Sequence, residues 1–148
     1  MISKMQIVPI RPALAAIIRN CVTFAEIPMA QRTSRDVLNK ALAAAKPDSS
    51  GPWLTLFRPP ESGTMDYAPG VFVPDGFEPG EEAISLFSLP QGSAAHLRLE
   101  GPYEELPQAW QDLFSACKSQ GLELAGLNWE VYTETSPQPV TDLYAWLA

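Results

Sequence analysis

The spacing of apolar residues along the chain predicts two helices, each with one apolar face. In the first helix, Thr23 fits the N-cap position, and Glu26 three residues later completes the spacing of a capping box. Pro47 and the turn-forming residues after it end this helix. The second helix begins near Glu104, and Gly121 is placed to end it just past the C-cap. The apolar positions are Val37, Leu38, Ala41 and Leu42 in the first helix and Leu106, Trp110, Leu113, Phe114 and Cys117 in the second.

Short runs typical of β-strands flank both predicted helices. Residues 5–19 are rich in Ile, Val and Leu, but Pro9 and Pro12 assign part of this run to an edge or a bend, because proline has no N–H for a strand ladder. In a later strand, Ala95, Leu97 and Leu99 share one face. The other predicted strands cover 53–57 and 71–73 after the first helix, 83–89 and 93–99 before the second, and 129–133 and 143–147 after it.

The chain also resembles itself when it is shifted by 79 positions, so that 13–30 falls on 92–109. A shift of 76 places Trp53 on Trp129, on the strands that follow the two helices. We interpret 1–148 as one domain with two copies of a strand, helix, strand, strand unit, at about 5–75 and about 83–148, although chance similarity is the alternative. The predicted fold class is α+β, an antiparallel sheet with two helices. Identical pairs are Ala15 and Ala94, Ala16 and Ala95, Arg19 and Arg98, Glu26 and Glu105, Pro28 and Pro107, and Ala30 and Ala109.

Composition narrows the class of protein. A length of 148 residues with 46% apolar and 18% charged residues is typical of one globular domain. The net charge of −7 and the scattered basic residues argue against direct binding of nucleic acid. The sequence has neither a membrane-spanning apolar run nor a signal peptide pattern, so we expect a cytoplasmic protein that does not bind membranes.

Residues that commonly carry catalysis or bind metals are few. His96 is the single histidine, and strand alternation predicts that it is exposed rather than a catalytic base. Cys117 falls on the apolar helix face, where a thiol behaves as a small inert hydrophobe, and nothing near Cys21 predicts a reactive thiol. Metal-ligand spacing and glycine-rich phosphate loops are absent. We therefore predict no metal, no cofactor and no catalytic residue.

Glu130 is the carboxylate with the most distinctive surroundings in the sequence. Alternation places Trp129 and Val131 on one face of their strand and Glu130, Tyr132 and Glu134 on the other. One interpretation is a solvated sheet face. The other is a carboxylate in a cleft lined by aromatic rings, which would attract a delocalised organic cation by charge and by cation–π contact.

Several aromatic residues are candidates for such a cleft. Trp53 and Phe57 share one strand face and form either a second wall of the groove or part of the core under a helix. Trp110 lies on a helix face that is more typical of a core. Tyr103 begins the same helix, where its ring can anchor the helix while its hydroxyl reaches the groove. The predicted ligand-binding set is Glu130, Tyr132, Trp53, Phe57, Tyr103, Trp110 and Trp146, of which Trp146 is a weaker candidate.

Three segments carry a resemblance to a known family: LPQGSAA at 89–95, LEGPYEEL at 99–106 and WEVY at 129–132. They resemble the GyrI-like ligand-binding family, which is also met as the effector-binding domain of some AraC-type and MerR-type regulators. This resemblance implies a pseudo-twofold pair of strand, helix, strand, strand units with a ligand groove between them, and it places Glu130 in that groove. Members bind amphipathic, often cationic small molecules, and some are described as gyrase inhibitors or as hydrolases of strained cyclopropane-bearing toxins.

We therefore expect a stand-alone binding protein for lipophilic, cationic small molecules, used in sensing or sequestration. The chain leaves no room for a helix-turn-helix segment, so a sensor would need a separate DNA-binding regulator as its partner. One alternative is a hydrolase of strained electrophilic toxins, in which Glu130 activates water and a tyrosine assists. Another is a protein-interaction module that inhibits a topoisomerase. The segment 59–82, rich in Pro, Gly and acidic residues, is a candidate for a long loop over the groove, and the sequence leaves open whether it covers the groove.

Overall fold

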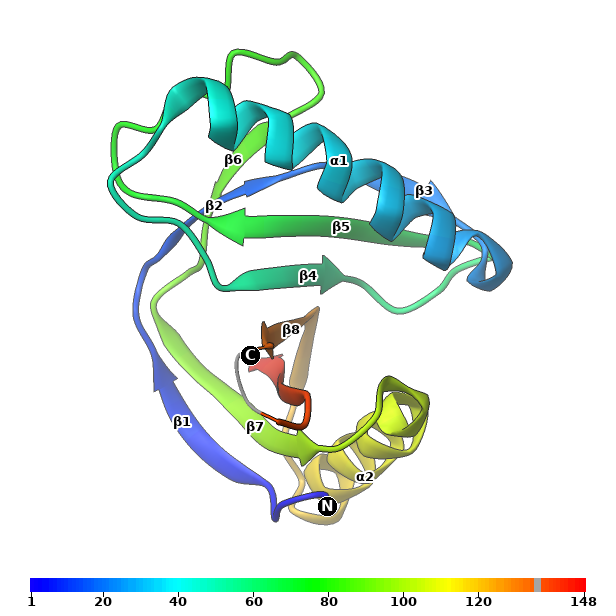
Figure 1. Ribbon diagram of the computed structural model, residues 1–148. Coiled ribbons are helices and arrows are strands. Elements are labelled where there is room, and N and C mark those ends of the chain that lie inside the picture. The colour runs from blue at the N-terminus through cyan, green and yellow to red at the C-terminus, as the bar shows by residue number, and fades with distance from the viewer. Residues whose placement is uncertain (135–136) are drawn as a thin grey trace. The chain divides into compact units, whose positions relative to one another are not determined.

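The computed structural model describes residues 1–134 and 137–148, which form two compact units. We call Pro12–Pro90 the N-unit and Met1–Arg11 together with Gln91–Ala148 the C-unit. Each unit contains an antiparallel sheet and one long helix (Figure 1). In the N-unit two strands precede the helix and three follow it, whereas in the C-unit two strands precede the helix and two follow it. The predicted α+β class, with an antiparallel sheet and two helices, is confirmed.

In the N-unit, the helix α1 contacts β5 and packs on a sheet whose strand order is β4, β5, β2, β6, with β3 also paired to β5. The buried cluster beneath α1 includes Ala16, Leu38 and Val71, at most 1% exposed. The elements are β2 (Leu14–Ile17), β3 (Asn20–Val22), the 3-10 helix η1 (Phe24–Glu26), α1 (Ile27–Ala45), β4 (Trp53–Phe57), β5 (Met65–Phe72) and β6 (Ser85–Ser88).

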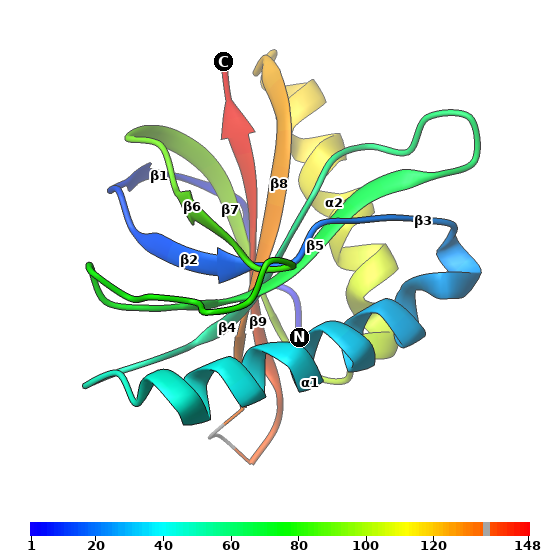
Figure 2. The same cartoon turned by 90° about the horizontal axis from the view of Figure 1, so that it is seen from above.

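In the C-unit, the strand order is β1, β7, β9, β8, which can be followed from above in Figure 2. Helix α2 contacts β7, and Leu97, Leu113 and Leu143 are among the buried side chains of this unit. The elements are β1 (Gln6–Ile10), β7 (Gly92–Glu100), the 3-10 helix η2 (Tyr103–Glu105), α2 (Leu106–Ser119), β8 (Leu124–Thr133) and β9 (Val140–Leu147). Among the described residues, neither helix combines the length and hydropathy needed to cross a membrane.

The local signals at the helix ends are confirmed. The backbone N–H of Thr23 donates to the Glu26 carboxylate at 2.9 Å, which caps η1 at the entrance to α1. After α2, Gly121 has a φ of 67°, and the N–H of Leu122 donates to the carbonyl of Cys117 at 2.9 Å. This pattern is a Schellman motif, in which glycine adopts the left-handed conformation at little cost.

The strand-rich run predicted over 5–19 is divided between the two units. β1 pairs with β7 in the C-unit, whereas β2 pairs with β5 and β6 in the N-unit. Pro9 lies in β1 at the end of the strand order, consistent with the predicted edge position. The break falls around Pro12, so the N-unit begins after β1 rather than at residue 5.

The strand predicted over 71–73 is longer in the structure and begins at Met65. It includes Pro69, which pairs with Thr55 of β4 on one side. On its other side, Pro69 faces the break between β2 and β3, where its carbonyl accepts the N–H of Ile18 at 3.0 Å. The missing N–H of proline therefore falls at an interruption of the ladder, which explains how a strand forms through this residue.

The alignment of Trp53 with Trp129 is wrong by one residue. Trp53 packs under α1 with Arg35 over its ring at 4.8 Å, whereas Trp129 lies on the sheet face opposite Glu130. Gln31 of α1 and Trp110 of α2 are related by the 79-residue shift. Gln31 donates a hydrogen bond to Thr55 of β4, and Trp110 donates one to Glu130 of β8. A shift of one residue in a strand exchanges its two faces, so the structural repeat pairs Thr55 with Glu130.

Candidate functional site

Glu130 lies on the face of the C-unit sheet that α2 covers. Its Oε1 accepts a hydrogen bond from Trp110 Nε1 of α2 at 2.7 Å, and its Oε2 accepts one from the Tyr132 hydroxyl at 2.6 Å. Residues two apart on a strand point to the same face, and the contact between Glu130 and Tyr132 agrees with the alternation derived from the sequence. The predicted candidates Glu130, Tyr132 and Trp110 therefore meet in one unit.

The electrostatics of this carboxyl are unusual. Burial raises the pKa of Glu130 above its ordinary value, and the hydrogen bonds from Tyr132 and Trp110 offset that effect only in part. In the part of the chain that the structure describes, the interactions of Glu130 are these two hydrogen bonds, and no basic side chain pairs with it. An ionised Glu130 is thus poorly solvated and lacks a positive counter-charge within that part of the chain.

Aromatic rings and one unsatisfied hydroxyl are neighbours of the two groups that donate to this carboxyl. Tyr103 packs edge-on against Tyr132, with ring centroids 6.1 Å apart, and remains 44% exposed. Trp110 stacks on Phe114 at 5.3 Å. Thr141 pairs with Tyr132 across the sheet, and its buried hydroxyl has no hydrogen-bond partner among the described residues. Thr141 is not among the residues predicted for the site, because nothing in the local sequence indicates that its hydroxyl stays unsatisfied.

Trp53 and Phe57 belong to the N-unit, and both lie on the face of its sheet that α1 covers. Trp53 packs against the core cluster under α1, and Phe57 packs against a second buried cluster that contains Tyr67. Beside them, Gln31 donates to the Thr55 hydroxyl at 2.6 Å and to the Tyr67 hydroxyl at 2.8 Å. The N-unit therefore has a neutral polar cluster at the positions where the C-unit has Glu130.

Trp146 lies on the opposite face of the C-unit sheet from Glu130. It approaches Trp129, with ring centroids 6.3 Å apart, and Trp129 stacks nearly parallel on Tyr144 at 5.2 Å. A side chain at Gly92 would collide with the Trp146 ring, so glycine is required at this close approach. Trp146, one of the seven predicted candidates, is thus in the same unit as Glu130 but on the other face of the sheet.

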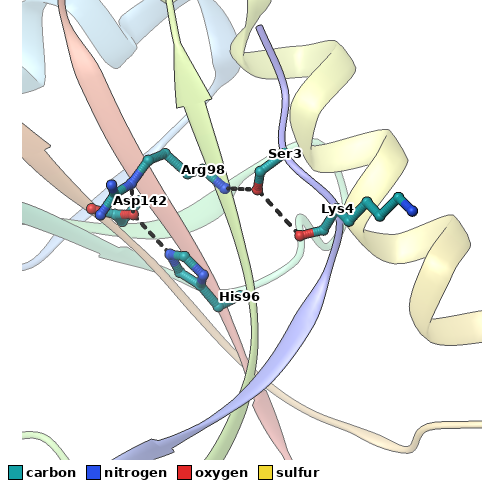
Figure 3. A network of polar contacts seen from close by, with 5 residues as sticks. All are labelled: Ser3, Lys4, His96, Arg98 and Asp142. Atoms are coloured by element: carbon teal, nitrogen blue, oxygen red, sulfur yellow. Dashed lines mark hydrogen bonds and ion pairs between the residues drawn. The ribbon is translucent and has the colours of Figure 1, made fainter.

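His96 is half-buried and hydrogen-bonded, so the prediction of an exposed histidine is wrong. Its Nε2 lies 2.7 Å from Asp142 Oδ1, and Arg98 Nε donates to the same oxygen at 2.9 Å (Figure 3). The backbone N–H of Arg98 also donates to the Ser3 hydroxyl. Burial opposes ionisation of Asp142, but the hydrogen bonds from His96 and Arg98 outweigh it and hold the pKa of Asp142 below its ordinary value.

The remaining reactive side chains do not form a metal site within residues 1–134 and 137–148, where no group of three or more His, Cys, Asp or Glu could hold an ion. Cys117 is buried on α2, and burial raises the pKa of its thiol, which agrees with the predicted inert role. Cys21 is an exposed free thiol in β3.

The fold is similar to several solved structures. The C-terminal domain of EcmrR matches with a TM-score of 0.77 and 19% identity, over 98% of this chain and 97% of that one. SAV2435 bound to tetraphenylphosphonium matches with a TM-score of 0.71 and 13% identity, over 99% and 94%. A hydrolase from Listeria innocua matches with a TM-score of 0.66 and 9% identity, over 98% and 92%. At these identities the likeness concerns the fold.

A comparison with curated proteins finds no match. The family model described as the GyrI-like small molecule binding domain, in contrast, matches residues 5–145, nearly the whole chain. The match includes both units and the resembling segments at 89–95, 99–106 and 129–132. This chain belongs to the GyrI-like small molecule binding domain family.

Proposed function

We propose that this domain binds lipophilic organic cations, with Glu130 as the anionic anchor and Tyr132, Tyr103 and Trp110 as its neighbours. The observation that carries the proposal is the state of the Glu130 carboxylate. It accepts hydrogen bonds from two aromatic donors, burial raises its pKa, and no basic side chain of the described residues pairs with it. A bound cation would supply the missing counter-charge.

The chemistry favours a delocalised cation over a small hydrated one. A buried carboxylate attracts positive charge more strongly than an exposed one because the local dielectric constant is lower. A large organic cation gives up less hydration than an ammonium ion, and each aromatic face adds about 0.5–2 kcal/mol of cation–π attraction. The half-exposed ring of Tyr103 is available for such contact.

One structural relative supports this ligand class. SAV2435 was solved with tetraphenylphosphonium, a cation whose charge is shielded by four phenyl rings. The same ligand class for this chain is our inference, made from Glu130 and its aromatic neighbours.

We further propose that binding serves sensing or sequestration in the cytoplasm. As a sensor, the domain would act with a separate DNA-binding regulator, and as a sequestering protein it would act alone. Trp53, Phe57 and Trp146 stay in the proposed ligand-binding set, but Trp53 and Phe57 belong to the N-unit and Trp146 to the opposite face of the C-unit sheet.

A titration with matched ligands tests the proposal. Methyltriphenylphosphonium and triphenylphosphine oxide have similar shapes, but only the first is charged. Tryptophan fluorescence would follow binding of both to the wild type, to Glu130→Gln and to Glu123→Gln, a control at an exposed residue of the same unit. We expect Glu130→Gln to weaken binding of the cation about tenfold or more and that of the neutral oxide less than twofold. Equal loss for both ligands would contradict the electrostatic role of Glu130.

A second candidate is hydrolysis of an electrophilic small molecule at the same carboxyl. The observation that favours it is the 2.6 Å contact between Glu130 and the Tyr132 hydroxyl, together with the raised pKa of Glu130, a pairing suited to general acid–base catalysis. Mass spectrometry of a cyclopropane-bearing compound incubated with the protein distinguishes the two candidates. Complete recovery of the compound at high protein concentration would rule against hydrolysis.

A further inference from the structure

A cleft lies within the N-unit, between the C-terminal half of α1 and the loop at 74–81. Its volume is about 830 Å³, within the range of about 300–1,000 Å³ that is typical of small-molecule sites. Glu130 belongs to the other unit, so this cleft is separate from the site described above.

The floor of the cleft is held in place by the core. Ala41 of α1 and Phe77 of the loop both line the cleft and both belong to the buried cluster around Leu38, with exposures of 8% and 6%. Because these side chains pack in the core, the loop is held against the helix before any ligand arrives. An apolar, preformed floor lowers the entropic cost of binding.

The rim carries charges of opposite sign on its two walls. Lys40 and Lys46 line the helix wall, and Asp75, Glu78 and Glu81 line the loop wall. All five are exposed, and within the described part of the chain none of them takes part in an ion pair. Asp48, just beyond the end of α1, adds a fourth carboxylate to the lining. The two walls therefore present unpaired positive and negative groups across an apolar floor.

We propose that this cleft binds a zwitterionic ligand with an apolar body, of the class of a short unmodified peptide. The ammonium group would lie against the loop carboxylates, and the carboxylate against Lys40 and Lys46. The lining has four carboxylates and two lysines, and the C-terminus of α1 adds a partial negative charge. The ammonium end therefore contributes the larger part of the attraction.

Capped peptides test this assignment directly. We would titrate ¹⁵N-labelled protein with trialanine, N-acetyl-trialanine and trialanine amide at millimolar concentrations and follow backbone amide shifts. Trialanine is expected to shift amides at Ala41 and Gly76. Each cap should weaken binding about two- to fivefold, as expected for partly exposed ion pairs, and acetylation should have the larger effect.

Two double variants assign the walls. In Glu78→Gln/Glu81→Gln, which keeps Asp75 and Asp48, acetylation of the peptide should weaken binding less than it does in the wild type. In Lys40→Gln/Lys46→Gln, amidation should no longer weaken binding. Glu61→Gln, at an exposed residue outside the cleft, serves as the matched control and should retain both effects. Circular dichroism establishes that these surface variants fold.

The proposal is overturned if trialanine leaves the cleft amides unshifted, if either cap has no effect on the wild type, or if the double variants respond to the caps as the wild type does. None of these results bears on Glu130, whose cation binding is measured with different ligands and variants. Failure of the cleft proposal and failure of the proposed function are thus distinguishable.

Discussion

The indole Nε1 of Trp110 donates a hydrogen bond to the Glu130 carboxylate across 2.7 Å, which joins α2 to β8. Trp110 is only 9% exposed, so the same side chain packs the helix against the sheet and orients the proposed anchor. A core role and a site role, which are alternatives for this residue in the sequence alone, are combined in one side chain. This arrangement suits a binding site that must keep a carboxylate in a fixed position.

Replacement of Trp110 by Phe should remove this donor while retaining an aromatic ring. A hydrogen bond to a charged group contributes about 1.5–3 kcal/mol, so the free energy of unfolding should fall by about that amount in urea denaturation at neutral pH. The pKa of Glu130, followed by ¹³C NMR of its carboxyl, should rise further because a lowering interaction is lost. Trp129→Phe, on the opposite face, should leave that pKa unchanged. An equal shift in both variants would contradict the role of the Trp110 donor.

The affinity for organic cations should depend on pH through Glu130. Its pKa in the folded protein is raised, so protonation begins at a higher pH than the ordinary value of 4.5 would give. As the pH falls through the raised pKa, the carboxylate becomes neutral, and the affinity for methyltriphenylphosphonium should fall with it. The affinity for triphenylphosphine oxide should stay constant. Titrations between pH 8 and pH 4.5 check this, and parallel pH profiles for the two ligands would count against it.

Replacement of Asp142 by Asn should destabilise the C-unit by about 1–3 kcal/mol at pH 7, because His96 and Arg98 both bond to one oxygen of this buried carboxylate. The pKa of Asp142 is lowered in the folded state, so its contribution is present above the unfolded pKa and is lost as pH falls through the folded one. The stability of the wild type and of the variant should therefore begin to converge only as the pH falls below the ordinary value of 3.8. A constant difference down to pH 2 would contradict this linkage.

Truncation of the core under α2 should have a large effect on stability. Leu113 is fully buried, and Leu113→Ala should lower the free energy of unfolding by about 2–5 kcal/mol through lost burial and the cavity left behind. Leu124→Ala removes the same atoms from a side chain that is 38% exposed and should cost much less, within about 1 kcal/mol. Thermal or urea unfolding of both variants provides the comparison. Similar losses would mean that the described packing of Leu113 is incorrect.

Local signals predicted the parts of this fold that depend on neighbouring residues. The Thr23 and Glu26 cap and the Gly121 termination involve contacts within a few positions of the chain, and the apolar face of each helix is visible in the spacing of its own residues. Strand alternation likewise placed Glu130 and Tyr132 on one face, because that relation is internal to a single strand. These features could be derived before any tertiary structure was known.

Relations between strands were predicted less well. The alignment of Trp53 with Trp129 missed the structural equivalence by one residue, because two tryptophans of similar sequence context lie on different faces. His96 was expected to be exposed, but its partner Asp142 is 46 residues away on β9, and only the pairing of β7 with β9 brings the two together. The extent of β5 also depended on its partners, since Pro69 lies opposite a break in the neighbouring strands.

The amino-acid sequence by itself determined the helix ends and the face of β8 that carries Glu130, because these follow from interactions between residues close in the chain. The tertiary structure alone decided that Trp110 reaches Glu130, that β1 belongs to the C-unit, and that Phe77 closes a cleft against α1. Each of these depends on which distant segments pack together. That choice is made by the burial of apolar surface and the pairing of strands over the whole unit, which no local pattern encodes.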